Sequence, residues 1–281
     1  MKFYSAFLFL IVFSTAGFCQ NYSAATYNVR LNLESDGINR WDHRKEWLTN
    51  QLQKYSPDII GTQEGLHNQI TYLDSTLTSY DYVGVGRKDG IHAGEYAAIF
   101  FNTEKFINID QGTFWLSETP DSVSIGWDAA NIRICSYTLL FDPSNNAHLW
   151  VFNAHLDHMG TESRIESLKL IRSYIQKLNT KNYPVLLMGD FNAEPDSKPI
   201  LYLTEYLRDA RTVSSTPPIG PEGTFNGFDV SHPLDKRIDY IFVSKNVEIR
   251  KYTVVNEIKD NRTPSDHLPV LVNFSLLKSK K

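Results

Sequence analysis

The sequence predicts an α/β protein in which two mixed sheets pack face to face and helices cover their outer faces. Three observations support this prediction. Helical patterns alternate with short apolar strand patterns early in the chain, hairpin patterns interrupt that alternation later, and neither an internal repeat nor a long linker divides the chain. Crossover helices join parallel strands, whereas hairpins need antiparallel neighbours, so a single doubly wound parallel sheet does not accommodate both.

Length and charge limit the class of protein. A chain of 281 residues is long enough for one large domain or two small ones. The formal net charge is −4. Proteins that coat nucleic acids without sequence preference depend on Lys and Arg displacing counterions, so this chain is a poor candidate for that class. An enzyme in which a metal ion supplies the positive charge locally is still compatible with the composition.

The N-terminus predicts a secretory signal peptide. Residues 3–18 are apolar apart from a few small residues, and this run is too short to span a membrane comfortably. Gly17 and Cys19 fit the small positions of a cleavage site, whereas Phe18 argues against a lipoprotein attached at Cys19. The alternative is an uncleaved membrane anchor. We therefore expect a secreted or periplasmic protein.

Removal of residues 1–20 would leave residues 21–281 as one domain. Cys135 is then the remaining cysteine, so an intrachain disulfide is impossible. It lies in an apolar strand pattern with no adjacent base, and we interpret it as a packed core residue.

The first part of the mature chain predicts strands joined by helices. Apolar residues at helical spacing predict the two helices, and Pro57 opens the second strand. A glycine-bearing loop containing Arg87 and Lys88 separates the third and fourth strands. It has neither dinucleotide spacing nor the ending of a P-loop, and its two cations are either substrate contacts or part of a solvated turn. The expected elements are strands at 23–31, 58–64, 80–86 and 95–101 and helices at 43–55 and 66–77.

The second part predicts a hairpin, a long helix and further strands. The turn at 142–146 is rich in Asp, Pro, Ser and Asn, which is typical of a hairpin connection. Residues 114–127 carry Trp, Ser and Pro without a period, which favours a surface loop that shapes a pocket. The expected elements are strands at 131–141, 147–153, 183–188, 237–242, 247–255 and 268–276 and helices at 162–179 and 200–207.

Polar side chains of a narrow set of types stand at the ends of these strands. The run at 183–188 is short and apolar, and it continues into Asp190 and Asn192. Alternation in an extended chain places these two residues on one side, whereas on these residues alone an Asx turn that leaves the strand is the better explanation. The full set is Asn28, Glu64, Glu95, His155, Asp190, Asn192, Asp239, Asp266 and His267.

This set predicts a divalent-metal site. Mg²⁺ prefers hard oxygen ligands, few of them from protein, and Glu64 and Asp266 are the candidates for direct ligation. A zinc site at His155, Asp157 and His158 is the alternative, but neither a thiolate nor helical His spacing supports it. His155 and His267 instead suit hydrogen bonding to phosphate and acid–base chemistry. Each would need an orienting carboxylate, and the chain offers Glu95 and Asp239.

The strand-end residues belong to short motifs that follow one another in a fixed order. The motifs are Thr26–Arg30, Gln63–Glu64, Gly94–Tyr96, Asn153–Asp157, Gly189–Asn192, Arg237–Ile241 and Ser265–Pro269. This ordered set resembles the endonuclease/exonuclease/phosphatase family, which includes DNase I-like nucleases, deadenylases, inositol-phosphate phosphatases and neutral sphingomyelinases. The resemblance spans nearly the whole mature chain, looks most like a secreted bacterial subgroup, and implies a four-layer α/β/β/α sandwich.

The resemblance also implies roles for individual residues. Glu64, with Asn28 and Asp266 nearby, would form the Mg²⁺ or Mn²⁺ site. Asp190 would orient or deprotonate the attacking water, and Asn192 would contact phosphate or metal. His155 and His267 would be the phosphate-binding and acid–base pair, oriented by Glu95 and Asp239. Beyond the family pattern, we name three candidate substrate contacts: Arg87, Trp115 and Arg164.

We therefore expect a metal-dependent phosphoesterase that acts by in-line attack of water. The first expectation for its substrate is a nucleic-acid phosphodiester, cut as an endonuclease or a 3′-5′ exonuclease. The alternatives are a phospholipid, sphingomyelin or inositol-phosphate hydrolase and, in a different class, a non-catalytic binding homologue. We expect a monomer whose partner is the phosphate-ester substrate.

Overall fold

The computed structural model describes residues 21–277. The expected signal peptide, residues 1–20, lies outside the described residues. Within them, no helix combines the length and the apolar character needed to cross a bilayer.

Twelve strands form two six-stranded sheets in the described part of the chain. Each sheet contains one parallel pair near its centre, β1–β2 in the first and β7–β8 in the second, and its other neighbours are antiparallel. The first sheet has the order β11 (Val247–Val254), β12 (Val270–Leu276), β1 (Tyr22–Asn28), β2 (Ile59–Gln63), β4 (Ala98–Asn102) and β3 (Tyr80–Val83). The second has the order β5 (Ile107–Trp115), β6 (Ile134–Asp142), β7 (Ala147–His155), β8 (Val185–Asp190), β10 (Asp239–Val243) and β9 (Arg208–Asp209).

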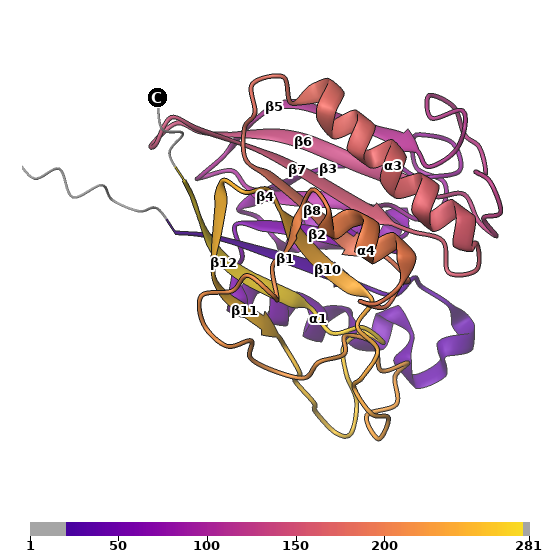
Figure 1. Cartoon of the computed structure of the whole chain (residues 1–281). Coiled ribbons are helices and arrows are strands. Elements are labelled where there is room, and N and C mark those ends of the chain that lie inside the picture. Colours follow the sequence, from indigo (N-terminus) through magenta and orange to yellow (C-terminus); the bar gives the residue numbers. More distant parts are fainter. Residues whose placement is uncertain (1–20, 278–281) are drawn as a thin grey trace, which may run out of the picture.

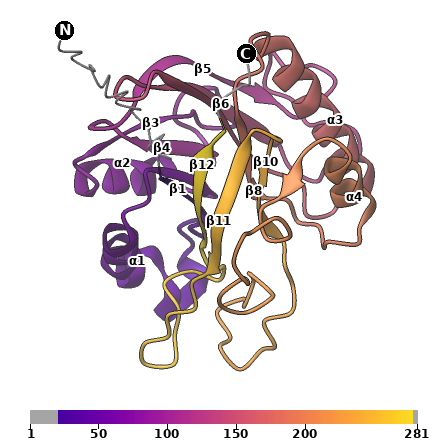
Figure 2. The ribbon, with the colours of Figure 1, turned by 60° about the vertical axis from the view of Figure 1, so that its left-hand side comes forward.

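The helices lie on the outer faces of the two sheets (Figures 1 and 2). The first sheet packs on α1 (Trp41–Tyr55) and α2 (His67–Thr76), which share an apolar cluster with β1, β2 and β4. The second packs on α3 (Thr161–Leu178) and α4 (Lys198–Thr204). A third cluster, which includes Ile59, Ile99, Val151 and Ile241, fills the space between the sheets. The predicted four-layer α/β/β/α sandwich is therefore confirmed.

Three elements differ from the prediction. Strand β5 was not expected, because polar residues such as Asn108, Asp110 and Gln111 interrupt its apolar pattern on an edge strand that is largely open to solvent. The end of β5 occupies the first two residues of the segment that we expected to be a loop. The short strand β9 and the 3₁₀ helix at Glu34–Asn39 were also not predicted. Cys135 is buried within β6, as expected.

Asn153 joins the two sheets through a buried hydrogen-bond network. Its Nδ2 donates to the carbonyl oxygens of Thr62 and Ala98, at 2.8 and 2.9 Å, and its Oδ1 accepts from Gln63 Nε2 at 2.7 Å. Thr62 and Ala98 are the last pair of the β2–β4 ladder. The amide thus satisfies backbone acceptors that no water reaches.

Replacing Asn153 with leucine is expected to lower the free energy of unfolding by about 2–4 kcal/mol, because buried acceptors and the Gln63 amide lose their partner. Urea denaturation would measure this loss. Asn273→Leu is the matched control, since Asn273 is exposed on β12 and its change should stay within about 0.5 kcal/mol. An equally small effect at Asn153 would contradict the proposed role of the network.

Candidate active site

All the strand-end residues meet at one end of the sandwich. Asn28 ends β1 and Glu64 follows β2, while His155 ends β7 and Asp190 ends β8; both strand pairs are parallel. Antiparallel neighbours begin at this same end, which explains why residues that precede or open a strand join them: Arg133 before β6, Glu95 before β4, Asp239 at the start of β10, and Asp266 and His267 before β12.

A pocket of about 510 Å³ opens at this end. It is of the size that small-molecule sites usually have. Its lining combines acids, cations and histidines with a few apolar side chains: Arg30, Leu31, Glu64, Arg87, Glu95, Asn131, Arg133, His155, His158, Asp190, Asn192, Phe225, Lys236, Ile238, Asp266 and His267.

The backbone around Gly189 brings Asp190 beside β7. Gly189 has φ +148°, and a Cβ there would meet the carbonyl oxygen of Ala154 at 1.9 Å, so only glycine permits this approach. Asp190 consequently pairs in register with His155. Its Oδ1 accepts from the backbone N of Asn192 at 2.9 Å, which is the Asx turn that we considered from sequence. The turn also places Asn192 in the pocket, at φ +47°.

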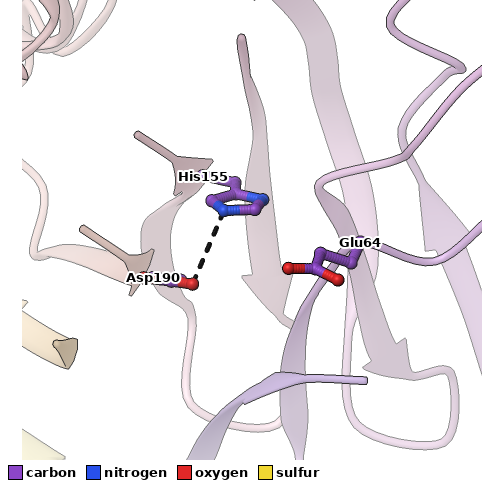
Figure 3. Close-up of side chains that lie close together, drawn as sticks. All are labelled: Glu64, His155 and Asp190. Carbon is purple, nitrogen blue, oxygen red and sulfur yellow. Dashed lines mark ion pairs between the residues drawn. The ribbon is translucent and has the colours of Figure 1, made fainter. Parts of the chain in front are cut away.

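The second carboxylate oxygen of Asp190 is the centre of the site. Asn28 Nδ2 donates to Asp190 Oδ2 at 3.0 Å, and the same Nδ2 lies 3.0 Å from Glu64 Oε1. The Nε2 atoms of His155 and His267 lie 3.5 and 3.7 Å from Asp190 Oδ2. Figure 3 shows His155, Asp190 and Glu64 pointing toward a common space. Side chains from residue 28 to residue 267 therefore converge on one carboxylate.

His267 is held by Asp239, as predicted from the resemblance. Its Nδ1 lies 2.8 Å from Asp239 Oδ2, so Nε2 is the nitrogen that faces Asp190. Burial alone would lower the pKa of His267, but the carboxylates of Asp239 and Asp190 outweigh it and raise that pKa well above its usual value. A protonated His267 presents an N–H donor toward Asp190.

His155 lies in a different electrostatic environment. Burial, together with the guanidinium groups of Arg133 and Arg87, lowers its pKa well below the usual value. Its Nδ1 is 3.8 Å from Glu95 Oε2, which is beyond hydrogen-bond distance. Glu95 instead pairs with both terminal nitrogens of Arg87, at 2.8 and 2.6 Å. Arg87 thus lines the pocket and shares its charge with Glu95.

Asn192 completes the contacts around His155. Its Nδ2 donates to the carbonyl oxygen of Leu156 at 3.0 Å and lies 3.1 Å from His155 Nε2. The side chain therefore stands at the pocket, beside the histidine that also faces Asp190.

The donor set fits a hard divalent cation. Ligand atoms of Glu64, His155 and Asp190 lie within 4.8 Å of one another, and so do those of Asp190, Asp239 and His267. Burial, reinforced by the charge of Asp239, raises the pKa of Asp190 to about 7. Carboxylates gathered in this way suit Mg²⁺ or Mn²⁺, whose charge would favour their ionised forms.

The other two predicted metal ligands are placed less directly. Asp266 lines the pocket, and its Oδ2 lies 3.7 Å from Arg30 Nη1, but it belongs to neither group of converging ligand atoms among the described residues. Asn28 turns its amide nitrogen toward Glu64 and Asp190, while its oxygen accepts from the backbone N of Arg30 at 2.9 Å. In this conformation Asn28 orients the two acids.

Two predicted substrate contacts do not line the pocket. Trp115 is buried, and its Nε1 donates to the carbonyl oxygen of Arg87 at 2.8 Å. Arg164 donates from Nη1 to the carbonyl oxygen of Asp157 at 2.8 Å. Both side chains support residues that do line the pocket or stand next to it. The sequence placed them near the site but did not reveal which way they point.

Several pocket residues were not predicted as site residues. Arg133 is the most buried of them, and we had placed it inside a strand starting at residue 131, whereas β6 begins at Ile134. The others are Arg30, Leu31, Asn131, His158, Phe225, Lys236 and Ile238. His158 was considered only as a zinc ligand. One feature of the sequence could have identified Arg133. This arginine directly precedes an apolar strand, and the neighbouring strands end in residues of the types found in catalytic sites.

Comparisons with known proteins place the chain in a family. Residues 25–267 match the endonuclease/exonuclease/phosphatase family. The structure is similar to a mannosyl-6-phosphatase from Bacteroides thetaiotaomicron (36% identity, TM-score 0.87, 91% of this chain and 100% of that one). The sequence is similar to an uncharacterized protein of Acanthamoeba polyphaga mimivirus, with 28% identity over 257 residues, 84% of this chain and 93% of the viral protein.

A more distant relative is a probable RNA exonuclease of Saccharomyces cerevisiae. It is 26% identical over 186 residues, which are 61% of this chain but only 36% of the yeast protein. The matched region of the family contains every strand-end residue of the site. The chain therefore belongs to the endonuclease/exonuclease/phosphatase family and is a phosphoesterase-type protein.

Proposed function

We propose that this protein is a divalent-metal-dependent phosphomonoesterase that hydrolyses sugar phosphates. The observation that supports this most is the position of Asp190 Oδ2, within 3.7 Å of Asn28, His155 and His267 and beside Glu64. The pocket around it is small, and its lining includes the cationic side chains of Arg30, Arg87 and Lys236. A compact, doubly charged phosphate monoester suits such a site.

The chain's own residues have distinct tasks in this reaction. Glu64 would hold Mg²⁺ or Mn²⁺ beside Asp190, and the ion would supply positive charge that neutralises phosphoryl oxygens. Asp190 orients the attacking water and accepts its proton as the water oxygen bonds to phosphorus. His267, fixed by Asp239, donates a hydrogen bond to a phosphoryl oxygen as the bond to the sugar oxygen breaks. The sugar oxygen takes a proton from solvent and leaves as a hydroxyl.

The second candidate is the nuclease activity that we expected first. Similarity to a probable RNA exonuclease favours it, as does the shared chemistry of phosphate esters. Two points favour the phosphomonoesterase. The mannosyl-6-phosphatase is more similar to this chain and matches it over nearly the full length of both. The net charge of −4 does not favour a long nucleic-acid track.

We further propose that the protein acts as a monomer outside the cytoplasm. The apolar run at residues 3–18 supports secretion, and an extracellular phosphatase would release sugars for uptake. N-terminal sequencing of the mature protein from culture fractions would test the cleavage near residues 19–21.

Parallel assays separate the two candidate activities. The purified protein with Mg²⁺ or Mn²⁺ would be given hexose 6-phosphates, p-nitrophenyl phosphate, bis-(p-nitrophenyl) phosphate, and single-stranded DNA and RNA oligonucleotides. The proposal expects phosphate release from the monoesters and intact oligonucleotides. Cleavage of the oligonucleotides without hydrolysis of the monoesters would favour the nuclease over the phosphomonoesterase. A protein that hydrolyses none of these esters would favour a non-catalytic homologue.

A further inference from the structure

We propose that Arg133 and His158 form a subsite that binds the hydroxyl groups of the sugar leaving group. This inference rests on the proposed function and assigns that substrate's sugar moiety to particular residues. It concerns the part of the pocket that the hydrolytic residues do not use.

Arg133 is held rigidly at the pocket wall. Its side chain is only 5% exposed, and its Nε donates to Asp157 Oδ2 at 3.2 Å. Asp157 is itself fixed, because its Oδ1 accepts from the backbone N atoms of Met159 and Gly160 at 2.9 and 2.8 Å. The guanidinium is therefore pre-oriented, and little conformational freedom is lost when it binds a ligand.

The remaining donors of this wall are available to a ligand. Arg133 Nη2 lies 3.1 Å from His158 Nδ1 and donates to it, so the proton of a neutral His158 is on Nε2. Within the described residues, Arg133 Nη1 has no hydrogen-bond partner. Both residues line the pocket, and His158 is exposed there. Two fixed donors beside each other match the adjacent hydroxyls of a sugar.

The strand order separates this wall from Phe225. Arg133 directly precedes β6, and the sheet continues through β7 with His155, β8 with Asp190 and β10 with Asp239. Asp239 holds His267, and the Phe225 ring packs edge-on against His267 at a centroid distance of 5.0 Å. Asp190 lies between the two histidines. The Arg133 wall therefore lies on the β6 side of Asp190, away from His267 and Phe225.

The donors of the Arg133 wall match the chemistry of a pyranose, which presents hydroxyls along the edge of its ring. An aryl phosphate has no hydroxyl for Arg133 or His158 to bind, and the proposal depends on this difference.

The test compares two esters in two variants. Hydrolysis of a hexose 6-phosphate and of p-nitrophenyl phosphate would be followed in wild type, Arg133→Lys and His158→Ala. Arg133→Lys keeps a cation beside Asp157 but loses the planar guanidinium group. His158 is exposed, so its replacement by alanine leaves no buried gap. Both variants should therefore fold. For each variant we expect kcat/KM for the sugar phosphate to fall about tenfold, mainly through KM, and the value for p-nitrophenyl phosphate to stay within about twofold.

His232→Ala is the matched control, because His232 is exposed and does not line the pocket, and both esters should be unaffected. If kcat/KM fell equally for both esters, Arg133 and His158 would act on the phosphoryl group. If kcat/KM did not fall for either ester, the two residues would have no role in binding. Either result overturns the subsite. A wild type that cleaves only p-nitrophenyl phosphate also overturns it but leaves a phosphomonoesterase. Inactivity toward both esters rejects the proposed function itself.

Discussion

His267→Ala is expected to lower kcat for phosphomonoester hydrolysis by about 10²–10³-fold, with a much smaller change in KM. The reason is geometric: Asp239 fixes His267 Nδ1 at 2.8 Å, and this aims Nε2 at the space beside Asp190 where the phosphoryl group would sit. Removing one preorganised donor to a developing negative charge has a cost of this size. Steady-state kinetics at saturating Mg²⁺ would measure it.

A folding control is needed, because His267 is buried and its loss leaves Asp239 without a partner. His267→Gln keeps a polar group beside Asp239 and should unfold close to the wild-type temperature while remaining strongly impaired. His232→Ala, on an exposed histidine, should keep full activity. A folded His267→Gln or His267→Ala variant with more than about a third of wild-type kcat would remove His267 from the mechanism.

Removal of divalent metal is expected to reduce hydrolysis to about 1% or less, and added Mg²⁺ or Mn²⁺ should restore it. Glu64→Gln should raise the metal concentration for half-maximal activity at least about tenfold, because an ionised ligand becomes a neutral one. Glu64 is already positioned for this role: its Oε1 accepts from Asn28 and its Oε2 accepts from the backbone N of Leu31 at 3.0 Å.

Calorimetric titration with Mn²⁺ provides a readout that does not depend on turnover. Wild type should bind the ion, and Glu64→Gln should bind it correspondingly more weakly. Glu222→Gln is a suitable control, since Glu222 is exposed and lies outside the pocket. Unchanged activity after thorough chelation, or unchanged Mn²⁺ affinity in Glu64→Gln, would contradict a metal site built on Glu64.

The sequence predicted the layers because hydrophobic periodicity reports burial. The strands β2, β7 and β8 are largely buried on both faces, and each contains an apolar run, such as residues 149–152 of β7 and 185–188 of β8. Strand β5 is an edge strand with one open face, so its polar residues concealed it. Pairing order and register depend on contacts between segments far apart in the chain, such as β1 with β12, and no local pattern contains them.

Part of the site could be predicted, because the direction of the strands determines which strand ends lie together. Parallel strands end at the same edge, so Asn28, Glu64, His155 and Asp190 could be expected to meet. Direction of side chains outside the strands could not be predicted. Trp115 turned out to support the Arg87 backbone, and Arg164 the Asp157 carbonyl. Arg133 was overlooked because a strand boundary set three residues too early hid its position at the pocket edge.

The most direct test of a water-attack phosphomonoesterase is hydrolysis of a hexose 6-phosphate in ¹⁸O-labelled water with Mg²⁺, followed by mass spectrometry of both products. Attack at phosphorus by the water that Asp190 orients predicts one ¹⁸O atom in each released phosphate and none in the sugar, with no release after chelation. Label in the sugar hydroxyl, or the absence of phosphate release from the folded, metal-loaded protein, would contradict it.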